Sequence, residues 1–331
     1  MGFQPWNAGT ERTPVRQRRH SLRRDQKTGQ WATFPPSVPP ITFATMTQAW
    51  EPYELIDFGD GRKLERFGER VLDRVAPAAE GFAKKHRAAW SQATMRYLRT
   101  SAEQGEWSPT TLAGQSWIVD FGLFSLELKA TPFGHIGVFA EQLDNWQWIA
   151  RRIARAGRPL KVLNLFAYTG GSTLAAAAAG AELTHVDAAK NVVAWARRNA
   201  EISQLADKPS RWIVEDAATF VRRELKRGRQ YDAVILDPPS YGHGPAGEDW
   251  KIDRDLPTLL GLCGELTASQ RSFLLLTCHS PNLGPADVQA LLADAVFGHC
   301  QSGASATPLT LRTNEHRQLP AGIVARWPPT L

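Results

Sequence analysis

The sequence is poor in cysteine. Its 331 residues include only Cys263, Cys278 and Cys300, which stand far apart and form no C-x-x-C pair. An odd number of widely spaced cysteines argues against a disulfide framework and against a zinc site. We therefore expect a protein of the reducing cytoplasm that holds no metal.

Long apolar runs are absent as well. A membrane-spanning helix needs about 20 consecutive apolar residues, and the longest run here, STLAAAAAGA at 172–181, is short and rich in alanine. The sequence thus predicts no membrane partner. With 43% hydrophobic residues, a chain of this length can bury a core of enzyme size and form one large domain beside a smaller one.

The positive charge of the chain is concentrated at its start. The formal net charge is +6, and residues 1–45 hold seven basic and two acidic side chains, so the remainder is nearly neutral. This segment lacks hydrophobic periodicity and contains FPPSVPP, which is typical of a disordered tail. Four alternatives stay open: an RNA-binding tail, a plain solvated extension, a mitochondrial-type targeting segment, or a start assigned too early, with Met46 as the true one.

Two regions follow the tail. From residue 46 to 130, short β-type runs such as YELIDFG, SWIVDFG and FSLELKA alternate with Gly and Pro, around a helical stretch near 78–93. This pattern predicts a small antiparallel β-rich domain, a candidate for substrate or RNA recognition. From 131 to 331, strand and helix patterns alternate regularly, which predicts an α/β fold with a parallel sheet and helices on both faces.

Ligands of such folds bind at the carboxyl ends of the strands, so the residues at those ends are the candidates. After the strand KVLNLF come Gly170 and Gly171, where the backbone can approach a cofactor closely. Asp187 follows the next strand, where a carboxylate accepts hydrogen bonds from ribose hydroxyls; it could instead cap the helix at 189–202. Asp216, after the third strand, suits a helix cap, an adenine contact, or both.

The last two strand ends carry the chemistry. Asp237 ends an apolar strand and is followed by two prolines and a glycine-rich loop, in ILDPPSYGHGP. Cys278 ends FLLLTC, which we expect to be the neighbouring strand. Because successive side chains of a strand face opposite sides, His279 and Cys278 point apart. Cys278 is either a small buried residue or a nucleophile near Asp237.

At these intervals, NLFAYTGG, HVD, EDA and DPPS resemble the motifs of class I S-adenosylmethionine-dependent methyltransferases, which have a Rossmann-like sheet. More closely, GHIGVFAEQ, DPPSYGHG and LLLTCHS are similar to the bacterial 23S ribosomal RNA cytosine-5 methyltransferases. The resemblance implies S-adenosyl-L-methionine as cofactor and ribosomal RNA as partner. It implies cofactor contacts by Phe166, Tyr168, Thr169, Gly170, Gly171, Asp187, Asp216, Asp237 and Pro238, and substrate contacts by Pro239, Ser240 and Tyr241.

The chemistry of that family would explain the cysteine. Carbon 5 of cytosine is a poor nucleophile until a thiolate adds to carbon 6, so Cys278 is the expected nucleophile and Asp237 its catalytic neighbour. Two other hypotheses remain. DPPS also resembles the motif that holds the amine in nitrogen methyltransferases, which need no thiol, and a catalytically silent module that binds the cofactor or RNA is the third reading.

Overall fold

The structure of the protein is a computed structural model that describes residues 52–101, 104–244, 247, 249–299 and 303–329. The predicted tail, the alternative start Met46 and Cys300 lie outside these residues. Gln48–Leu331 form one compact unit, and the described residues all belong to it. The division near residue 130 that the sequence predicts stays a prediction.

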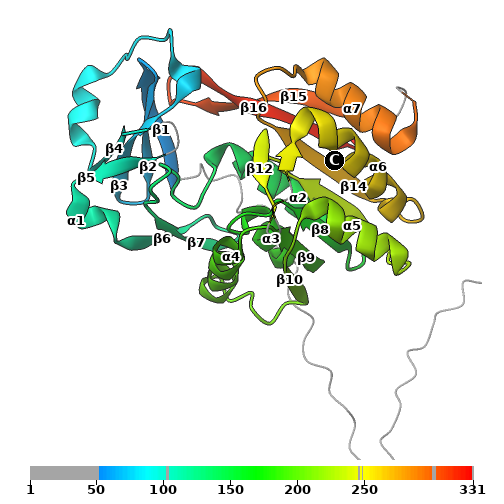
Figure 1. The fold of residues 1–331 in the computed structure, drawn as a ribbon. Helices are drawn as coiled ribbons and strands as arrows, with labels where there is room; N and C mark the ends of the chain where they lie inside the picture. Colours follow the sequence, from blue (N-terminus) through cyan, green and yellow to red (C-terminus); the bar gives the residue numbers. More distant parts are fainter. Residues whose placement is uncertain (1–51, 102–103, 245–246, 248, 300–302, 330–331) are drawn as a thin grey trace, which may run out of the picture. The chain divides into compact units, whose positions relative to one another are not determined.

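The first part of the chain is β-rich, as expected. Figure 1 shows its five-stranded sheet in blue and cyan, in the order β1-β2-β3-β4-β5. The strands are β1 (Tyr53–Gly59), β2 (Arg62–Phe67), β3 (Arg70–Val75), β4 (Met95–Arg99) and β5 (Gly105–Ser108). All pairs are antiparallel except β3 with β4. The helical stretch expected near 78–93 forms two 3-10 turns, η2 (Pro77–Ala79) and η3 (Arg87–Gln92).

A short helix and a hairpin lead from this sheet to the second part. They are α1 (Thr110–Ala113), β6 (Ser116–Asp120) and β7 (Ser125–Lys129). The hairpin packs against helix α4 (Lys190–Ile202), where the Trp195 indole donates a hydrogen bond of 2.9 Å to the Glu127 carbonyl. Buried residues of the β-rich sheet, of α4 and of the helices α2 (Leu143–Arg155) and α3 (Gly171–Ala178) thus share one hydrophobic cluster.

The second part is built on a seven-stranded sheet in the order β10-β9-β8-β11-β14-β16-β15. Five strands run parallel: β8 (Lys161–Leu165), β9 (Glu182–Asp187), β10 (Ser210–Val214), β11 (Ala233–Leu236) and β14 (Phe273–Cys278). The hairpin of β15 (Ser305–Arg312) and β16 (Gln318–Trp327) adds antiparallel to β14. The predicted Rossmann-like α/β fold is confirmed.

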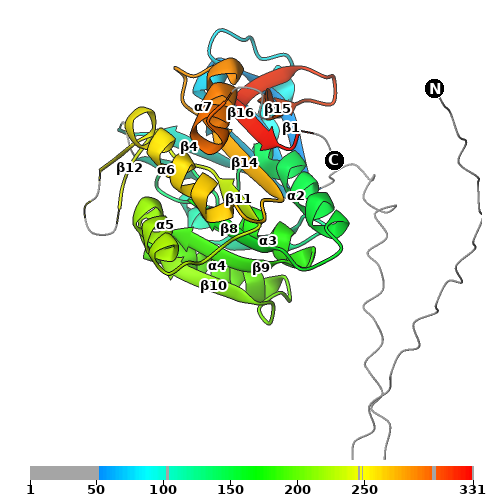
Figure 2. The same cartoon turned by 90° about the vertical axis from the view of Figure 1, so that its right-hand side faces the viewer.

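Helices cover both faces of this sheet (Figures 1 and 2). On one face lie α2 (Leu143–Arg155), α3 (Gly171–Ala178) and α4; on the other lie α5 (Ala217–Lys226), α6 (Ile252–Thr267) and α7 (Pro285–Phe297). Burial on both faces explains why β8, β11 and β14 are nearly continuous apolar runs. Between β11 and α6, the chain forms the small hairpin of β12 (Tyr241–His243) and β13 (Asp249–Lys251).

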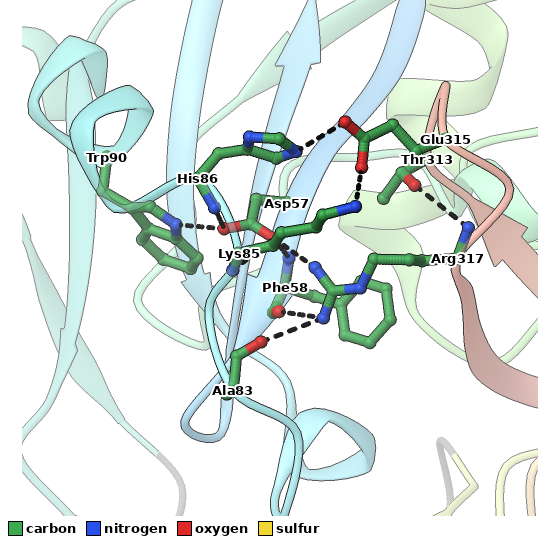
Figure 3. Close-up of polar contacts among 9 residues, drawn as sticks. All are labelled: Asp57, Phe58, Ala83, Lys85, His86, Trp90, Thr313, Glu315 and Arg317. Atoms are coloured by element: carbon green, nitrogen blue, oxygen red, sulfur yellow. Dashed lines mark hydrogen bonds and ion pairs between the residues drawn. The ribbon is translucent and has the colours of Figure 1, made fainter.

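A buried aspartate joins the first strand of the described chain to its last hairpin (Figure 3). The Asp57 carboxylate is fully buried and accepts five hydrogen bonds, from the amides of Phe58, Lys85 and His86, the Trp90 indole and the Arg317 guanidinium. Arg317, which precedes β16, also donates to the carbonyls of Phe58 and Ala83. This contact attaches the β15–β16 hairpin to the β-rich sheet.

Candidate active site

A cavity of about 570 Å³ lies at the carboxyl ends of the parallel strands. Of the candidates, it is lined by Phe166, Tyr168, Asp187, Asp216, Asp237, Pro238 and Pro239. Its other lining residues include Phe139, Glu141, Gly242, Gly244, Trp250 and His279. A narrow second cavity of about 40 Å³ adjoins it, and there Thr169 and Gly171 meet Asp237. The structure therefore brings most predicted cofactor residues to one place.

The loop after β8 enters the cavity through an unusual backbone. Phe166 and Tyr168 both have positive φ angles, of 53° and 50°, and Gly170 follows at 94°. Left-handed conformations are costly for residues with a Cβ atom and concentrate at functional sites. Here they turn both aromatic rings toward the cavity. Burial raises the pKa of Tyr168 to about 12, so its phenol stays neutral.

The two glycines of this loop serve packing as much as ligand access. Gly170 caps α3 at its N-terminus. A Cβ atom on Gly171 would lie 2.4 Å from the Trp146 ring of α2. Gly171 lines only the narrow cavity, and Gly170 lines neither.

Asp187 ends β9, and two backbone amides hold its carboxylate. One carboxylate oxygen accepts a hydrogen bond of 2.9 Å from the Tyr168 amide, and the other accepts one of 2.9 Å from the Ala189 amide. Burial raises its pKa, and the two amides act against that rise. Since each carboxylate oxygen offers two lone-pair sites, one site per oxygen remains for a ligand hydroxyl in the cavity.

Asp216 caps the helix that follows it. Its side chain accepts a hydrogen bond of 2.8 Å from the Thr219 amide at the start of α5, and it still lines the cavity. The neighbouring Glu215, which sequence reasoning did not single out, also lines the cavity and is paired with Arg223. Acidic groups beside the apolar Val186, Ala188 and Ala217 form a wall that suits an adenosine.

Asp237 stands at the centre of a polar network. Its carboxylate accepts hydrogen bonds from the Thr277 hydroxyl at 2.5 Å and from the Gln142 amide at 3.1 Å. Gln142 is buried and is held by Asn145 at 2.7 Å, which in turn accepts a hydrogen bond from Arg326. About 30% of the Asp237 side chain is exposed to the cavity region. The network therefore fixes this carboxylate and leaves it accessible.

His279 is the third partner of Asp237. Its Nε2 lies 3.1 Å from the carboxylate, and its Nδ1 lies 2.8 Å from the Ala321 carbonyl. Both ring nitrogens therefore face acceptors, which is the pattern of a doubly protonated ring. Burial lowers the pKa of His279, but Asp237, the Glu141 charge and the Ala321 carbonyl outweigh it and raise the pKa to about 9. The ring is a cation at neutral pH.

Cys278 lies in the apolar interior beside the site, and its role as nucleophile stays a prediction. Leu274, Leu276 and Cys278 alternate toward the face covered by α5 to α7, and the thiol is fully buried in that apolar cluster. It does not line the cavity, and burial raises its pKa. Thr277 faces Asp237 from the other side of β14. The predicted neighbouring of β11 and β14 is confirmed, but His279 is the residue that reaches the cavity.

The substrate candidates divide as well. Pro239 lines the cavity and its carbonyl accepts a hydrogen bond of 2.7 Å from the Trp250 indole, whereas Ser240 and Tyr241 lie on the exposed side of the small hairpin. Trp250 packs against Phe166, with ring centroids 4.9 Å apart. No spacing in the sequence indicated Trp250. Glu141 and Gln142 belong to GHIGVFAEQ, a motif that supports the family resemblance but assigns no function to these two residues.

Two further findings on the described part of the chain concern metal ions and membranes. No group of three or more His, Cys, Asp or Glu side chains there could hold a metal ion. None of the described helices is long and apolar enough to cross a bilayer. Cys263 is fully buried in α6 and its pKa is raised to about 12, which agrees with a structural role.

Comparison with known proteins places this site in a family. The sequence model of the S-adenosylmethionine-dependent methyltransferases matches residues 64–287. A solved S-adenosylmethionine-dependent methyltransferase from Agrobacterium tumefaciens is 34% identical and superposes with a TM-score of 0.79, over 85% of this chain and 92% of that one. A solved protein from Streptococcus mutans is 17% identical and superposes with a TM-score of 0.66, over 86% of this chain and 77% of that one, which supports the fold alone.

Curated relatives match shorter stretches. Ribosomal RNA large subunit methyltransferase K/L of Shewanella sp. (strain MR-4) is 33% identical over 139 residues, 41% of this chain but only 19% of the relative. Ribosomal RNA large subunit methyltransferase K of Neisseria meningitidis serogroup B is 23% identical over 248 residues, 72% of this chain and 66% of the relative. From the family match, the solved relative and the cavity at the strand ends, it follows that the chain belongs to the S-adenosylmethionine-dependent methyltransferases.

Proposed function

We propose that this protein transfers the methyl group of S-adenosylmethionine to a nucleobase of RNA, with ribosomal RNA as the substrate and the cytoplasm as its place of action. The observation that carries this proposal is Asp237, a fixed but accessible carboxylate beside Pro238 at the mouth of the cofactor cavity. The names of the curated relatives support the choice of ribosomal RNA.

The cofactor would occupy the part of the cavity next to Asp187. Asp187 would accept hydrogen bonds from the ribose hydroxyls, and the apolar wall around Val186 and Ala217 would receive the adenine. Phe166 and Tyr168 would cover the bound cofactor and exclude water. When bound, S-adenosylmethionine supplies an electrophilic methyl group on a sulfonium.

We infer that the acceptor is a nitrogen and not carbon 5 of cytosine. An exocyclic or ring nitrogen has its own lone pair, so it can attack the sulfonium methyl without a thiol adduct. Asp237 would accept a hydrogen bond from the N–H of the acceptor and so aim the lone pair at the methyl group. The new N–C bond forms as the S–C bond breaks, and the proton leaves to solvent.

Cytosine-5 methylation is the second candidate, and one observation favours it. Cys278 ends the strand directly beside the one that leads to Asp237, as the thiol mechanism requires. The thiol is nevertheless buried on the opposite face of β14, and its raised pKa disfavours the thiolate. The residues 277–279 would have to turn over for this thiol to reach a base.

Nucleoside mass spectrometry tests the two candidates together. The protein is incubated with isotope-labelled S-adenosylmethionine and bulk ribosomal RNA, and the digested nucleosides are analysed for the label. We expect an N-methylated nucleoside, formed equally by Cys278→Ala and by the matched control Cys263→Ala. Labelled 5-methylcytosine that disappears in Cys278→Ala alone would support the second candidate. No labelled nucleoside from any ribosomal RNA would overturn the RNA proposal.

A further inference from the structure

A second groove opens beside the active-site cavity. It has a volume of about 280 Å³ and is lined by side chains of the β-rich sheet and of the segment before α2, among them Lys63, Arg74, Tyr97, Arg99, Phe133 and His135. Phe139 and Glu141 line both this groove and the active-site cavity. The two hollows therefore share part of one wall.

The turn at 131–135 on the edge of this groove is held firmly. The Trp107 indole donates a hydrogen bond of 2.8 Å to the Thr131 carbonyl, and the Tyr97 hydroxyl donates one of 2.8 Å to the Pro132 carbonyl. A Cβ atom on Gly134, whose φ is +83°, would lie 2.7 Å from the Tyr97 ring. The turn nevertheless presents Phe133 with 57% of its surface exposed. A large aromatic held outward on a fixed turn suits a stacking contact.

Basic side chains surround the same groove. Arg74 is buried and donates two hydrogen bonds to Glu65, and Lys63 forms an ion pair of 3.0 Å with the same carboxylate. Two positive charges thus share one negative charge. Arg99 is exposed and forms no ion pair with any described residue. The pKa of His135 is lowered, first by burial and then by the charges of Arg74 and Lys63, which indicates a positive potential here.

Aromatic rings connect the groove to the active site. The rings of His135 and Phe139 lie 5.2 Å apart, and those of Phe139 and Tyr168 lie 5.2 Å apart. Tyr168 belongs to the active-site cavity. Single-stranded nucleic acids bind surfaces that combine aromatic platforms with basic side chains along the backbone. Duplexes offer only buried base faces, so an aromatic row favours a single strand.

We propose that this groove binds the single-stranded RNA segment next to the target nucleotide, with a base stacked on Phe133 and a phosphate at Arg99. The inference rests on the proposed function and adds a site to it. The target base would enter the active-site cavity past Phe139, while its neighbours would follow the aromatic row toward the β-rich sheet.

Fluorescence anisotropy with a labelled single-stranded RNA of 12 nucleotides measures this site without requiring turnover. We expect Phe133→Ala and Phe133→Leu to raise the dissociation constant about 5-fold or more, since a stacked base contributes at least about 1 kcal/mol. Arg99→Gln should lower the slope of log K against log salt concentration by about 0.7, the value for one phosphate contact of a single strand. Arg229→Gln, which removes an exposed arginine beyond α5, is the matched control and should change neither quantity.

Kinetics then separate the possible failures. In methylation assays we expect Phe133→Ala to raise KM for RNA with kcat unchanged, and thermal melting should be unchanged because the side chain is exposed. If the parent binds and methylates RNA and all three groove variants match Arg229→Gln, the groove assignment is overturned while the proposed function stands. If the parent protein binds no RNA, both are overturned.

Discussion

Two aspartates in this molecule have the same chemistry and opposite circumstances. Asp57, on β1, is fully buried and accepts five hydrogen bonds, including one from the Arg317 guanidinium (Figure 3). Asp237, after β11, accepts hydrogen bonds from two side chains and pairs with His279, but about 30% of it stays exposed. The first carboxylate has no lone pair left over for a ligand, and the second does.

The difference shows how burial separates structure from function. Burial acts to raise the pKa of Asp57, but its hydrogen bonds, with Trp90 first, lower it, so the carboxylate stays charged and is stabilised entirely from within the fold. Such a group joins parts of a protein and cannot meet a substrate. Asp237 is fixed on one side by Gln142 and Thr277 and is open on the other, which is the arrangement that catalysis by orientation needs.

Substitution of Asp57 should have the largest effect, and it should be on stability. Asp57→Asn leaves the Arg317 guanidinium without its counter-ion, and breaking a buried ion pair in this way costs about 3–5 kcal/mol. In urea unfolding, this loss of stability should appear as a lower midpoint concentration for Asp57→Asn than for the parent protein. Asp207→Asn removes an exposed carboxylate and serves as control. An equal midpoint in the two variants would contradict the structural role.

Substitution of Asp237 should affect the reaction and leave the fold intact. Asp237→Asn keeps the size of the side chain but makes it a weaker hydrogen-bond acceptor for the N–H of the proposed acceptor nitrogen. We expect kcat to fall about 100-fold, equal to about 2.7 kcal/mol in the barrier. The free energy of unfolding, measured in urea, should change by less than about 1 kcal/mol. If the urea midpoint of Asp237→Asn fell as far as that of Asp57→Asn, both aspartates would have a structural role and the contrast between them would be wrong.

Asp187 tests the cofactor side of the same cavity. In Asp187→Asn one of the two oxygens that we propose as ribose acceptors becomes a donor, and hydrogen bonds to charged groups are worth about 1.5–3 kcal/mol. Titration calorimetry should therefore show S-adenosylmethionine binding weakened about 10-fold or more. Asp216→Asn keeps the helix cap and is the comparison, with a smaller loss. Unchanged affinity in Asp187→Asn would remove the ribose assignment.

His279 should show the smallest effect on rate and the clearest effect of pH. Its pKa of about 9 lies above the ordinary value of 6.5, so the ring is charged at neutral pH and loses its proton as the pH rises through about 9. We expect kcat of the parent to decline there, because Asp237 loses a partner. His279→Gln should be about 3- to 10-fold slower at pH 7, and this decline should be absent. A decline that persists in the variant would exclude His279 as its source.

Much of the site could be predicted because it follows from strand ends. Asp187 ends β9, Asp216 follows β10 by two residues and Asp237 directly follows β11, and parallel strands bring their carboxyl ends to one edge. Gln142 could not be found this way. It lies 95 residues before Asp237 in the sequence, on the 3-10 turn η4 (Ala140–Gln142), and the two meet only because α2 packs against the sheet.

Position 278 shows the limit most clearly. Alternation along β14 determines from the sequence alone that Cys278 and His279 point to opposite sides. Which of them faces the cavity depends on which face the helices α5 to α7 cover, and that is a property of the assembled sheet. The sequence by itself determined the α/β order and the carboxylates at the strand ends, because both depend on local pattern. Only the tertiary structure decided that the thiol is buried and the histidine reaches Asp237, because that choice depends on packing between distant segments.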